Sequence, residues 1–186
     1  MRIVLVHPRG FNWFPGRRDI TDVANRMVPQ GILSIAACLL KQGHEVFVYD
    51  CLGPGVPADL DAQVRAILGY GPDLVGFSAT TSSFLDAARM AQEIKKRAAR
   101  VKTVCGGVHV SALQDELLPA YPGFDFLCAG EGELTMAELA GGADPAEIRG
   151  LIWRRDSAPI ANAPRPQIAD LDSLPFPAYE KLEGFP

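Results

Sequence analysis

The sequence lacks several features that mark other classes of protein. None of its four cysteines pairs with another at CxxC spacing, so we expect neither a zinc site nor an iron–sulfur cluster held by this chain. No apolar run approaches the length needed to cross a bilayer, and the run at residues 3–6 is too short for a signal peptide. Basic residues are not in excess, and a net charge of −4 argues against nucleic acid as a partner.

What remains is the composition of a folded domain. The chain has 186 residues, of which 48% are hydrophobic, enough for one domain with a sizeable core. The cysteines have apolar neighbours, which suits buried, reduced thiols and predicts a cytoplasmic protein. The basic run at residues 95–100 lies at the expected end of a helix, where cations are favourable, so we interpret it as a solvated helix end.

Apolar, β-rich segments alternate with segments of helical period along residues 1–147. Strands are predicted at residues 3–6, 44–50, 73–79, 101–105 and 125–129. Helices are predicted around residues 32–39, 60–68, 83–94, 111–118 and 134–139, the third with a capping box formed by Ser83 and Asp86. This succession predicts an α/β, doubly wound, flavodoxin- or Rossmann-like fold with a five-stranded parallel sheet in the order 2-1-3-4-5.

The character of the chain changes near residue 148. Residues 149–164 predict a small β-hairpin that turns at Asp156 and Ser157. Prolines then become dense, which predicts an extended tail with apolar anchors at Leu174, Phe176 and Tyr179. We therefore divide the chain into a domain at 1–147 and a hairpin with a Pro-rich linker at 148–186. The linker is expected to cross to another domain, or else to pack on its own domain as a tail.

Small and hydroxyl-bearing residues follow three of the predicted strands. They occur at residues 78–81, at residues 106–107 and, alternating with two glutamates, as the glycines of residues 130–133, while a long loop with aromatic side chains follows the first strand at residues 8–30. In parallel sheets, ligands bind where the carboxyl ends of the strands meet, so we expect these segments to lie side by side. Residues of this kind let a ligand approach the backbone and bond to it.

Three other kinds of site fit this edge less well. A dinucleotide needs a GxGxxG run directly after the first strand, where this chain has His7 to Gly10. A phosphoacceptor receiver domain needs an aspartate at the end of the third strand, where Ser78 stands. No Walker A motif is present either.

Several segments together resemble one known family. Ser78-Ala79-Thr80 and Gly106-Gly107 resemble the Ser-x-Leu and Gly-Gly elements of cobalamin-binding domains, with Thr80 in place of leucine. A fuller set of segments, spread over almost the whole chain, resembles the N-terminal half of cobalamin-binding radical SAM proteins. These segments are "VPQGILSIAACLLKQGHEV", "PDLVGFSATT", "CGGVHVSAL", "AGEGELT" and "DLDSLPFPAYE". The resemblance implies a cobalamin (B12)-binding domain of a cobalamin-dependent radical SAM enzyme of methyltransferase type.

Two motifs of related proteins are missing. Many cobalamin domains carry Asp-x-His-x-x-Gly, whose histidine binds cobalt, and its absence here implies base-off binding without a histidine ligand. The CxxxCxxC motif for a [4Fe–4S] cluster is also absent, so we expect a fragment whose parent binds the cluster and S-adenosylmethionine in a C-terminal radical SAM domain. We assign this chain no catalytic residue and no metal ligand. The alternative is a scaffold or interaction module of the same ancestry that has lost cobalamin.

The resemblance implies a set of cofactor-binding residues: Gln30, Gly31, Ser78, Thr80, Thr81, Gly106, Gly107, Val108, His109, Gly130, Glu131 and Gly132. The paired glycines would leave bare backbone beside the benzimidazole of the nucleotide tail, and the hydroxyls would suit its ring nitrogen or phosphate. Residues 130–133 would lie beside the ribose or base, and the loop at 8–30 would cover one face of the corrin. Simpler interpretations stay open: a tight turn for the glycines, helix caps for the hydroxyls, and a buried strand-end residue for His7.

Overall fold

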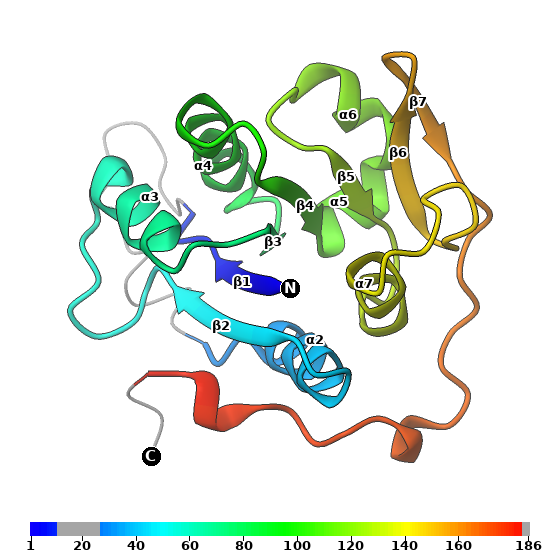
Figure 1. Ribbon diagram of the computed structural model, residues 1–186, viewed down its shortest axis with the longest axis horizontal. Coiled ribbons are helices and arrows are strands. Elements are labelled where there is room, and N and C mark those ends of the chain that lie inside the picture. The colour runs from blue at the N-terminus through cyan, green and yellow to red at the C-terminus, as the bar shows by residue number, and fades with distance from the viewer. Residues whose placement is uncertain (11–26, 184–186) are drawn as a thin grey trace.

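The computed structural model describes residues 1–10 and 27–183, so most of the loop expected to cover the corrin, residues 11–26, lies outside the described part. One mixed sheet forms the centre of the molecule, in the order β2-β1-β3-β4-β5-β6-β7 (Figure 1). Its strands are β1 (Arg2–His7), β2 (Glu45–Asp50), β3 (Leu74–Ser78), β4 (Lys102–Gly106), β5 (Phe126–Cys128), β6 (Leu151–Arg155) and β7 (Ala158–Ala161).

The predicted parallel sheet is confirmed, and the hairpin extends it. Strands β1 to β5 pair in parallel in the order 2-1-3-4-5. Strand β6 pairs antiparallel with β5, where Leu127 lies opposite Ile152, and β7 pairs antiparallel with β6. The hairpin turns at Asp156 and Ser157, whose φ angles of 50° and 71° suit a tight two-residue turn.

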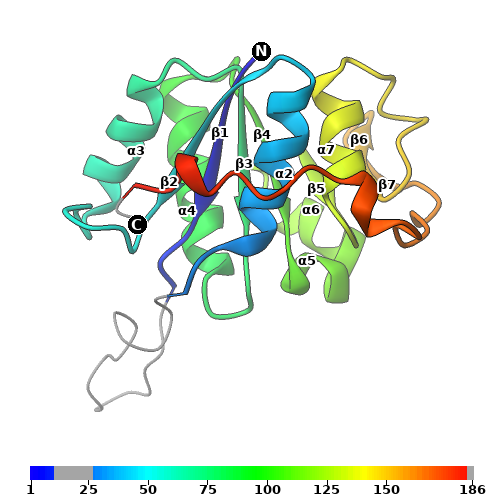
Figure 2. The ribbon, with the colours of Figure 1, turned by 90° about the horizontal axis from the view of Figure 1, so that it is seen from below.

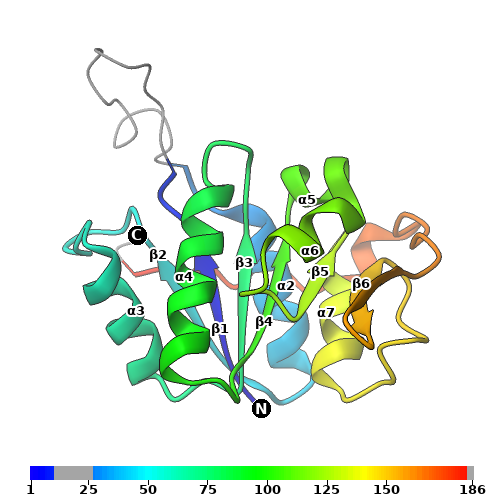
Figure 3. The ribbon, with the colours of Figure 1, turned by 90° about the horizontal axis from the view of Figure 1, so that it is seen from above.

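Helices cover both faces of the sheet. They are α2 (Gln30–Lys41), α3 (Leu60–Gly69), α4 (Phe84–Arg97), α5 (Val108–Leu113), α6 (Leu117–Ala120) and α7 (Glu133–Ala140), with 3-10 turns at η1 (Gln114–Glu116), η2 (Leu171–Ser173) and η3 (Tyr179–Lys181). Helices α2 and α7 lie on one face (Figure 2), and α3 and α4 lie on the other (Figure 3). Both faces of the parallel strands are therefore buried, which explains their nearly continuous apolar sequences.

Two local predictions were wrong. Ser83 does precede α4, but its side chain makes no capping bond to the helix. Its hydroxyl accepts the N–H of Thr80 at 3.0 Å, and the carboxylate of Asp86 accepts the N–H of Gly10 at 3.0 Å. Both side chains therefore bond to groups outside the helix, and no capping box forms. The helix predicted near 111–118 begins at Val108 and is interrupted at Gln114, where a φ of 50° breaks it into α5, η1 and α6.

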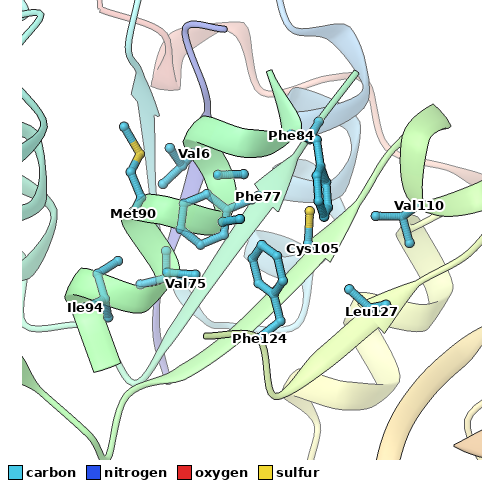
Figure 4. Packing of buried hydrophobic residues seen from close by; sticks show 14 of the residues in the cluster. Val6, Val75, Phe77, Phe84, Met90, Ile94, Cys105, Val110, Phe124 and Leu127 are labelled. Carbon is cyan, nitrogen blue, oxygen red and sulfur yellow. The ribbon is translucent and has the colours of Figure 1, made fainter. Parts of the chain in front are cut away.

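Aromatic side chains fill the space between the sheet and α4 (Figure 4). Phe84 and Phe124 are almost completely buried, with ring centroids 6.0 Å apart. The ring of Phe77 meets that of Phe124 edge-on at the same separation. Buried aromatic side chains contribute large apolar areas, so this face supplies much of the stability of the domain.

The C-terminal segment packs back on its own domain. Residues 164–182 run along the outer side of α7 and α2 (Figures 1 and 2). The side chain of Ala178 is buried against the α2 side of the core, and its N–H donates to the carbonyl of Leu33 at 3.0 Å. The extended conformation predicted for this segment is interrupted only by the short turns η2 and η3.

Candidate cofactor-binding site

Two adjoining cavities open at the carboxyl edge of the parallel strands, where a ligand site was predicted. The first, here called the α2–α7 cavity, has a volume of about 220 Å³ and lies between those two helices and the sheet. Seven of the predicted residues line it: Gly31, Ser78, Gly106, Gly107, Gly130, Glu131 and Gly132. The structure therefore brings together segments that follow the first, third, fourth and fifth strands.

The second cavity, here called the β1-end cavity, has a volume of about 310 Å³. It contains the predicted residues Gln30 and Thr80 and shares Gly31 and Ser78 with the first cavity. His7 also lines it, from the last position of β1. The Nδ1 atom of His7 lies 3.0 Å from the carboxylate of Asp50, so the imidazole is held by the neighbouring strand.

Glycines form much of the floor and wall of the α2–α7 cavity, and their missing side chains let neighbouring groups approach the backbone. A Cβ atom at Gly76, in the middle of β3, would lie 2.9 Å from Cδ2 of Leu5 and 3.5 Å from Cε of Met136. A Cβ at Gly31 or Gly130 would meet nothing within 4 Å, so both positions leave free space at the wall. Sequence reasoning missed Gly76, although a glycine inside an apolar strand is itself a signal of close approach.

Gly107 has a different role from the other glycines of the cavity. Its φ is 100°, and a Cβ there would lie 2.5 Å from the carbonyl oxygen of Ala79. The N–H of Ala79 in turn donates to the carbonyl of Gly106 at 2.9 Å. The second glycine of the pair is therefore required by the contact between two loops, which supports the tight-turn interpretation for this position.

Three hydroxyl-bearing residues, Ser78, Thr80 and Ser111, lie at this edge of the sheet and differ in their hydrogen bonds. Ser78 lines both cavities, and its hydroxyl makes no hydrogen bond to any other described residue. The hydroxyl of Thr80 lies 3.2 Å from that of Ser83, within the turn before α4. Ser111, which the sequence did not single out, donates to the carbonyl of Gly107 at 3.1 Å and accepts the N–H of Gly130 at 3.0 Å. Ser111 thus ties the loops after β4 and β5 together.

Three predicted residues lie near this edge but line neither cavity: Thr81, Val108 and His109. The Nδ1 atom of His109 lies 3.2 Å from the hydroxyl of Thr81, and its ring packs 4.3 Å from that of Phe84. Val108 exposes 68% of its surface at the start of α5. These residues form an outer rim beside the cavities.

Most side chains in the wall of the α2–α7 cavity are apolar, and Glu131 and Glu133 add two carboxylates from the loop before α7 and from its first residue. Leu5, Ile32, Val104 and Met136 contribute hydrocarbon surface. Burial raises the pKa of the Cys128 thiol to about 11, so this wall residue is a neutral thiol at physiological pH. An apolar slot with a glycine floor and a single unengaged hydroxyl suits a flat heteroaromatic ring with one hydrogen-bonding nitrogen.

The described residues contain neither a candidate metal site nor a helix that could cross a membrane. Within residues 1–10 and 27–183, no group of three or more His, Cys, Asp or Glu side chains is placed to hold a metal ion. In the same ranges, no helix has both the length and the apolar composition needed to cross a membrane.

Comparison with curated proteins gives relatives that are much longer than this chain. An uncharacterized methyltransferase of Pyrococcus horikoshii is 31% identical over 98% of this chain and 39% of its own length. An anaerobic magnesium-protoporphyrin IX monomethyl ester cyclase of a Synechocystis strain is 32% identical over 79% of this chain and 30% of its own length. The chain therefore spans less than half the length of these relatives.

Comparison with solved structures supports the fold. The radical S-adenosylmethionine methyltransferase TsrM from Kitasatospora setae, solved with cobalamin and a [4Fe–4S] cluster bound, superposes with a TM-score of 0.69. The match covers 94% of this chain and 30% of that chain at 20% sequence identity. A family model described as the B12 binding domain matches residues 17–140, which is more than half of the sequence. The predicted family is confirmed, and the chain belongs to the B12-binding domain family.

Proposed function

We propose that this chain binds cobalamin in the base-off form, with the nucleotide tail in the α2–α7 cavity and no histidine of the chain on cobalt. The observation that carries the proposal is the cavity floored by glycines and walled mainly by apolar side chains, with Ser78 lining both it and the β1-end cavity. A volume of about 220 Å³ is smaller than the roughly 300–1,000 Å³ of sites that enclose a whole drug-sized ligand. The cavity therefore fits one part of a large cofactor, such as its benzimidazole ring.

Each group of residues then has a distinct task. The hydroxyl of Ser78 bonds to the ring nitrogen of the tail, and Gly31 and Gly130 leave room for the tail to enter. Gln30 and Thr80, in the β1-end cavity, face the polar part of the tail. Thr81, Val108 and His109 form the rim on which the corrin lies. These groups bind and orient the cofactor, and none of them is assigned a bond-making step.

The parent protein is proposed to be a cobalamin-dependent radical SAM methyltransferase. Two similar proteins support this proposal: the uncharacterized methyltransferase of Pyrococcus horikoshii and the radical S-adenosylmethionine methyltransferase TsrM. In such an enzyme, cobalamin supplies a carrier for a methyl group. Residues 1–147 would hold the cofactor, and residues 148–186 would lead to a cytoplasmic C-terminal domain that binds the cluster and S-adenosylmethionine.

Binding of hydroxocobalamin to the purified chain, followed by gel filtration, tests the assignment. We expect the corrin absorbance to elute with the protein and to show a base-off spectrum. A protein peak without that absorbance would contradict the proposal and favour a scaffold that has lost cobalamin.

Two matched substitutions locate the site. Gly31 and Gly69 both lie in helices, and a Cβ atom at either would meet nothing within 4 Å. Gly31 lines both cavities, whereas Gly69 lies on the opposite side of the sheet at the end of α3. Gly31→Leu should weaken cobalamin binding at least about tenfold, and Gly69→Leu should leave it unchanged. Equal affinities in the two variants would place the tail elsewhere.

A further inference from the structure

We propose that residues 164–182, here called the strap, are a positioning element that holds the two walls of the α2–α7 cavity at the separation the cofactor needs. The inference rests on the proposed cobalamin site and adds a role for a segment that forms none of the cavity wall. Its basis is a set of hydrogen bonds that join the strap to both wall helices and to two predicted site residues.

The first anchor fastens the strap to α7. The Nε atom of Arg165 donates to the hydroxyl of Thr135 at 2.9 Å, and its guanidinium pairs with the carboxylate of Glu138. The Arg165 side chain is only 9% exposed, whereas that of Glu138 is 42% exposed, so the guanidinium is buried against α7 and meets its carboxylate at the surface. The beginning of the strap is therefore fixed to the outer side of one wall helix.

The second anchor reaches the cavity itself. The backbone N–H of Ile168 donates to Oε2 of Glu131 at 2.8 Å. Glu131 lies in the loop between β5 and α7 and lines the α2–α7 cavity. A backbone amide of the strap thus sets the orientation of a wall residue that precedes it by 37 positions in the sequence.

The third anchor fastens the strap to α2. The N–H of Ala178 donates to the carbonyl of Leu33 at 3.0 Å, and the Ala178 side chain is 4% exposed. The Nε2 atom of Gln30 donates to the hydroxyl of Tyr179 at 2.5 Å. Gln30 begins α2 and lines the β1-end cavity, so the end of the strap holds a second site residue.

Between its anchors the strap leaves two large apolar side chains exposed, whereas Leu174 is half-buried. Leu171 is 65% exposed and Phe176 is 94% exposed, so the prediction that Phe176 is an apolar anchor was wrong. The segment is therefore attached at discrete points and lies on the outer side of both wall helices (Figure 2). Because the cavity lies between α2 and α7, a bridge across them limits how far the walls can separate.

Coupling between the strap and the cofactor follows from this arrangement. Gln30 and Glu131 face the strap from one side and the cavities from the other. If the strap fixes the orientation of these two side chains, it favours the orientation that binds the cofactor, and the bound cofactor favours the orientation that binds the strap. Such coupling is reciprocal. Bound cobalamin should therefore tighten the strap, and loss of a strap anchor should weaken cobalamin binding.

Hydrogen exchange on the whole chain, with and without hydroxocobalamin, tests the first consequence. We expect cobalamin to slow exchange of the amides of residues 168 and 178 about fivefold or more, in the range typical of coupled sites. A merely structural strap would be slowed no more than buried amides on the α4 side of the sheet, such as that of Ala87, because any ligand of the folded state slows exchange that needs global unfolding.

A conservative substitution tests the second consequence. Tyr179→Phe removes only the hydroxyl that Gln30 contacts, and Tyr70→Phe is the matched control on a tyrosine away from both cavities. We expect Tyr179→Phe to raise the Kd for cobalamin about threefold to tenfold, as for a lost hydrogen bond, with the thermal midpoint of the free protein nearly unchanged. Tyr70→Phe should leave the Kd unchanged.

The outcomes separate the two proposals. If the wild-type chain binds cobalamin but the exchange rates and the Kd of Tyr179→Phe stay unchanged, the strap proposal is wrong and the cofactor site stands. If the wild-type chain does not bind cobalamin at all, the proposed function fails and the strap proposal fails with it.

Discussion

The two faces of the central sheet are filled in opposite ways. On the α4 side, Phe77, Phe84 and Phe124 pack against one another and leave the space filled with aromatic rings. On the α2–α7 side, Gly76 and Gly106 occupy positions where other strands carry side chains, and a cavity of about 220 Å³ remains. The same strands therefore build a dense core on one face and a ligand slot on the other.

Strand β3 shows how one sequence serves both purposes. Successive side chains of a strand point to opposite faces, so Val75 and Phe77 belong to the aromatic side. Gly76 and Ser78 alternate with them and lie on the cavity side. The cavity therefore lies on the face where glycine takes the place of a larger side chain, and the buried side chains of the opposite face supply the stability.

The largest effect on stability is expected on the aromatic side. Phe124→Ala should lower the free energy of unfolding by about 3–5 kcal/mol, because it removes a fully buried ring and leaves a void. Chemical denaturation measures this loss. Any folded protein that remains should bind cobalamin with nearly the wild-type Kd, and a large change in Kd would show that the two faces are not independent.

Gly107→Ala should cause the next largest loss, about 1–3 kcal/mol of folding free energy. The added Cβ would lie 2.5 Å from the carbonyl oxygen of Ala79 in a backbone conformation with a φ of 100°. Thermal unfolding of the free protein is the measurement. If the variant is as stable as the wild type and only cobalamin binding suffers, then Gly107 faces the tail and does not serve the turn.

Gly76→Ala is expected to separate stability from binding. The new methyl group would approach Cδ2 of Leu5, the end of a flexible side chain. The free energy of unfolding should therefore change by less than about 1 kcal/mol. The same methyl narrows the cavity floor, and the Kd for cobalamin should rise about tenfold. Absorbance titration gives the Kd, and an unchanged value would mean that the tail does not reach β3.

The smallest effect concerns two buried thiols on opposite faces. Burial raises the pKa of both Cys105 and Cys128, so both should react slowly with iodoacetamide at pH 8. Cys128 lines the cavity, whereas Cys105 lies in the aromatic core. Cobalamin should slow alkylation of Cys128 severalfold more than that of Cys105, measured by mass spectrometry. Equal protection would indicate a general effect on folding.

The strands and the edge of the sheet that holds the candidate site could be predicted from the sequence, and the failures have physical causes. The strands were identifiable because continuous apolar runs are typical of a sheet covered on both faces. The position of the site followed from the carboxyl ends of those strands, and seven predicted residues do line the α2–α7 cavity. Both inferences depend only on local patterns and on topology.

Contacts between distant residues could not be predicted in this way. The expected capping box failed because Asp86 bonds to Gly10, which precedes it by 76 positions. The strap anchors join Gln30 to Tyr179 and Glu131 to Ile168, pairs that no local pattern marks. Gly76 was missed for another reason: its strand was interpreted as a whole, and its two faces were not separated.

The central claim is that the α2–α7 cavity receives the nucleotide tail, and cobinamide tests it most directly because it is the same corrin without that tail. The measurement compares the Kd values of cobalamin and cobinamide for the wild type and for Gly76→Ala. We predict that the wild type binds cobalamin at least about tenfold more tightly than cobinamide, and that Gly76→Ala weakens cobalamin binding alone. Equal affinity for the two corrinoids, or equal loss of both in Gly76→Ala, would contradict the account.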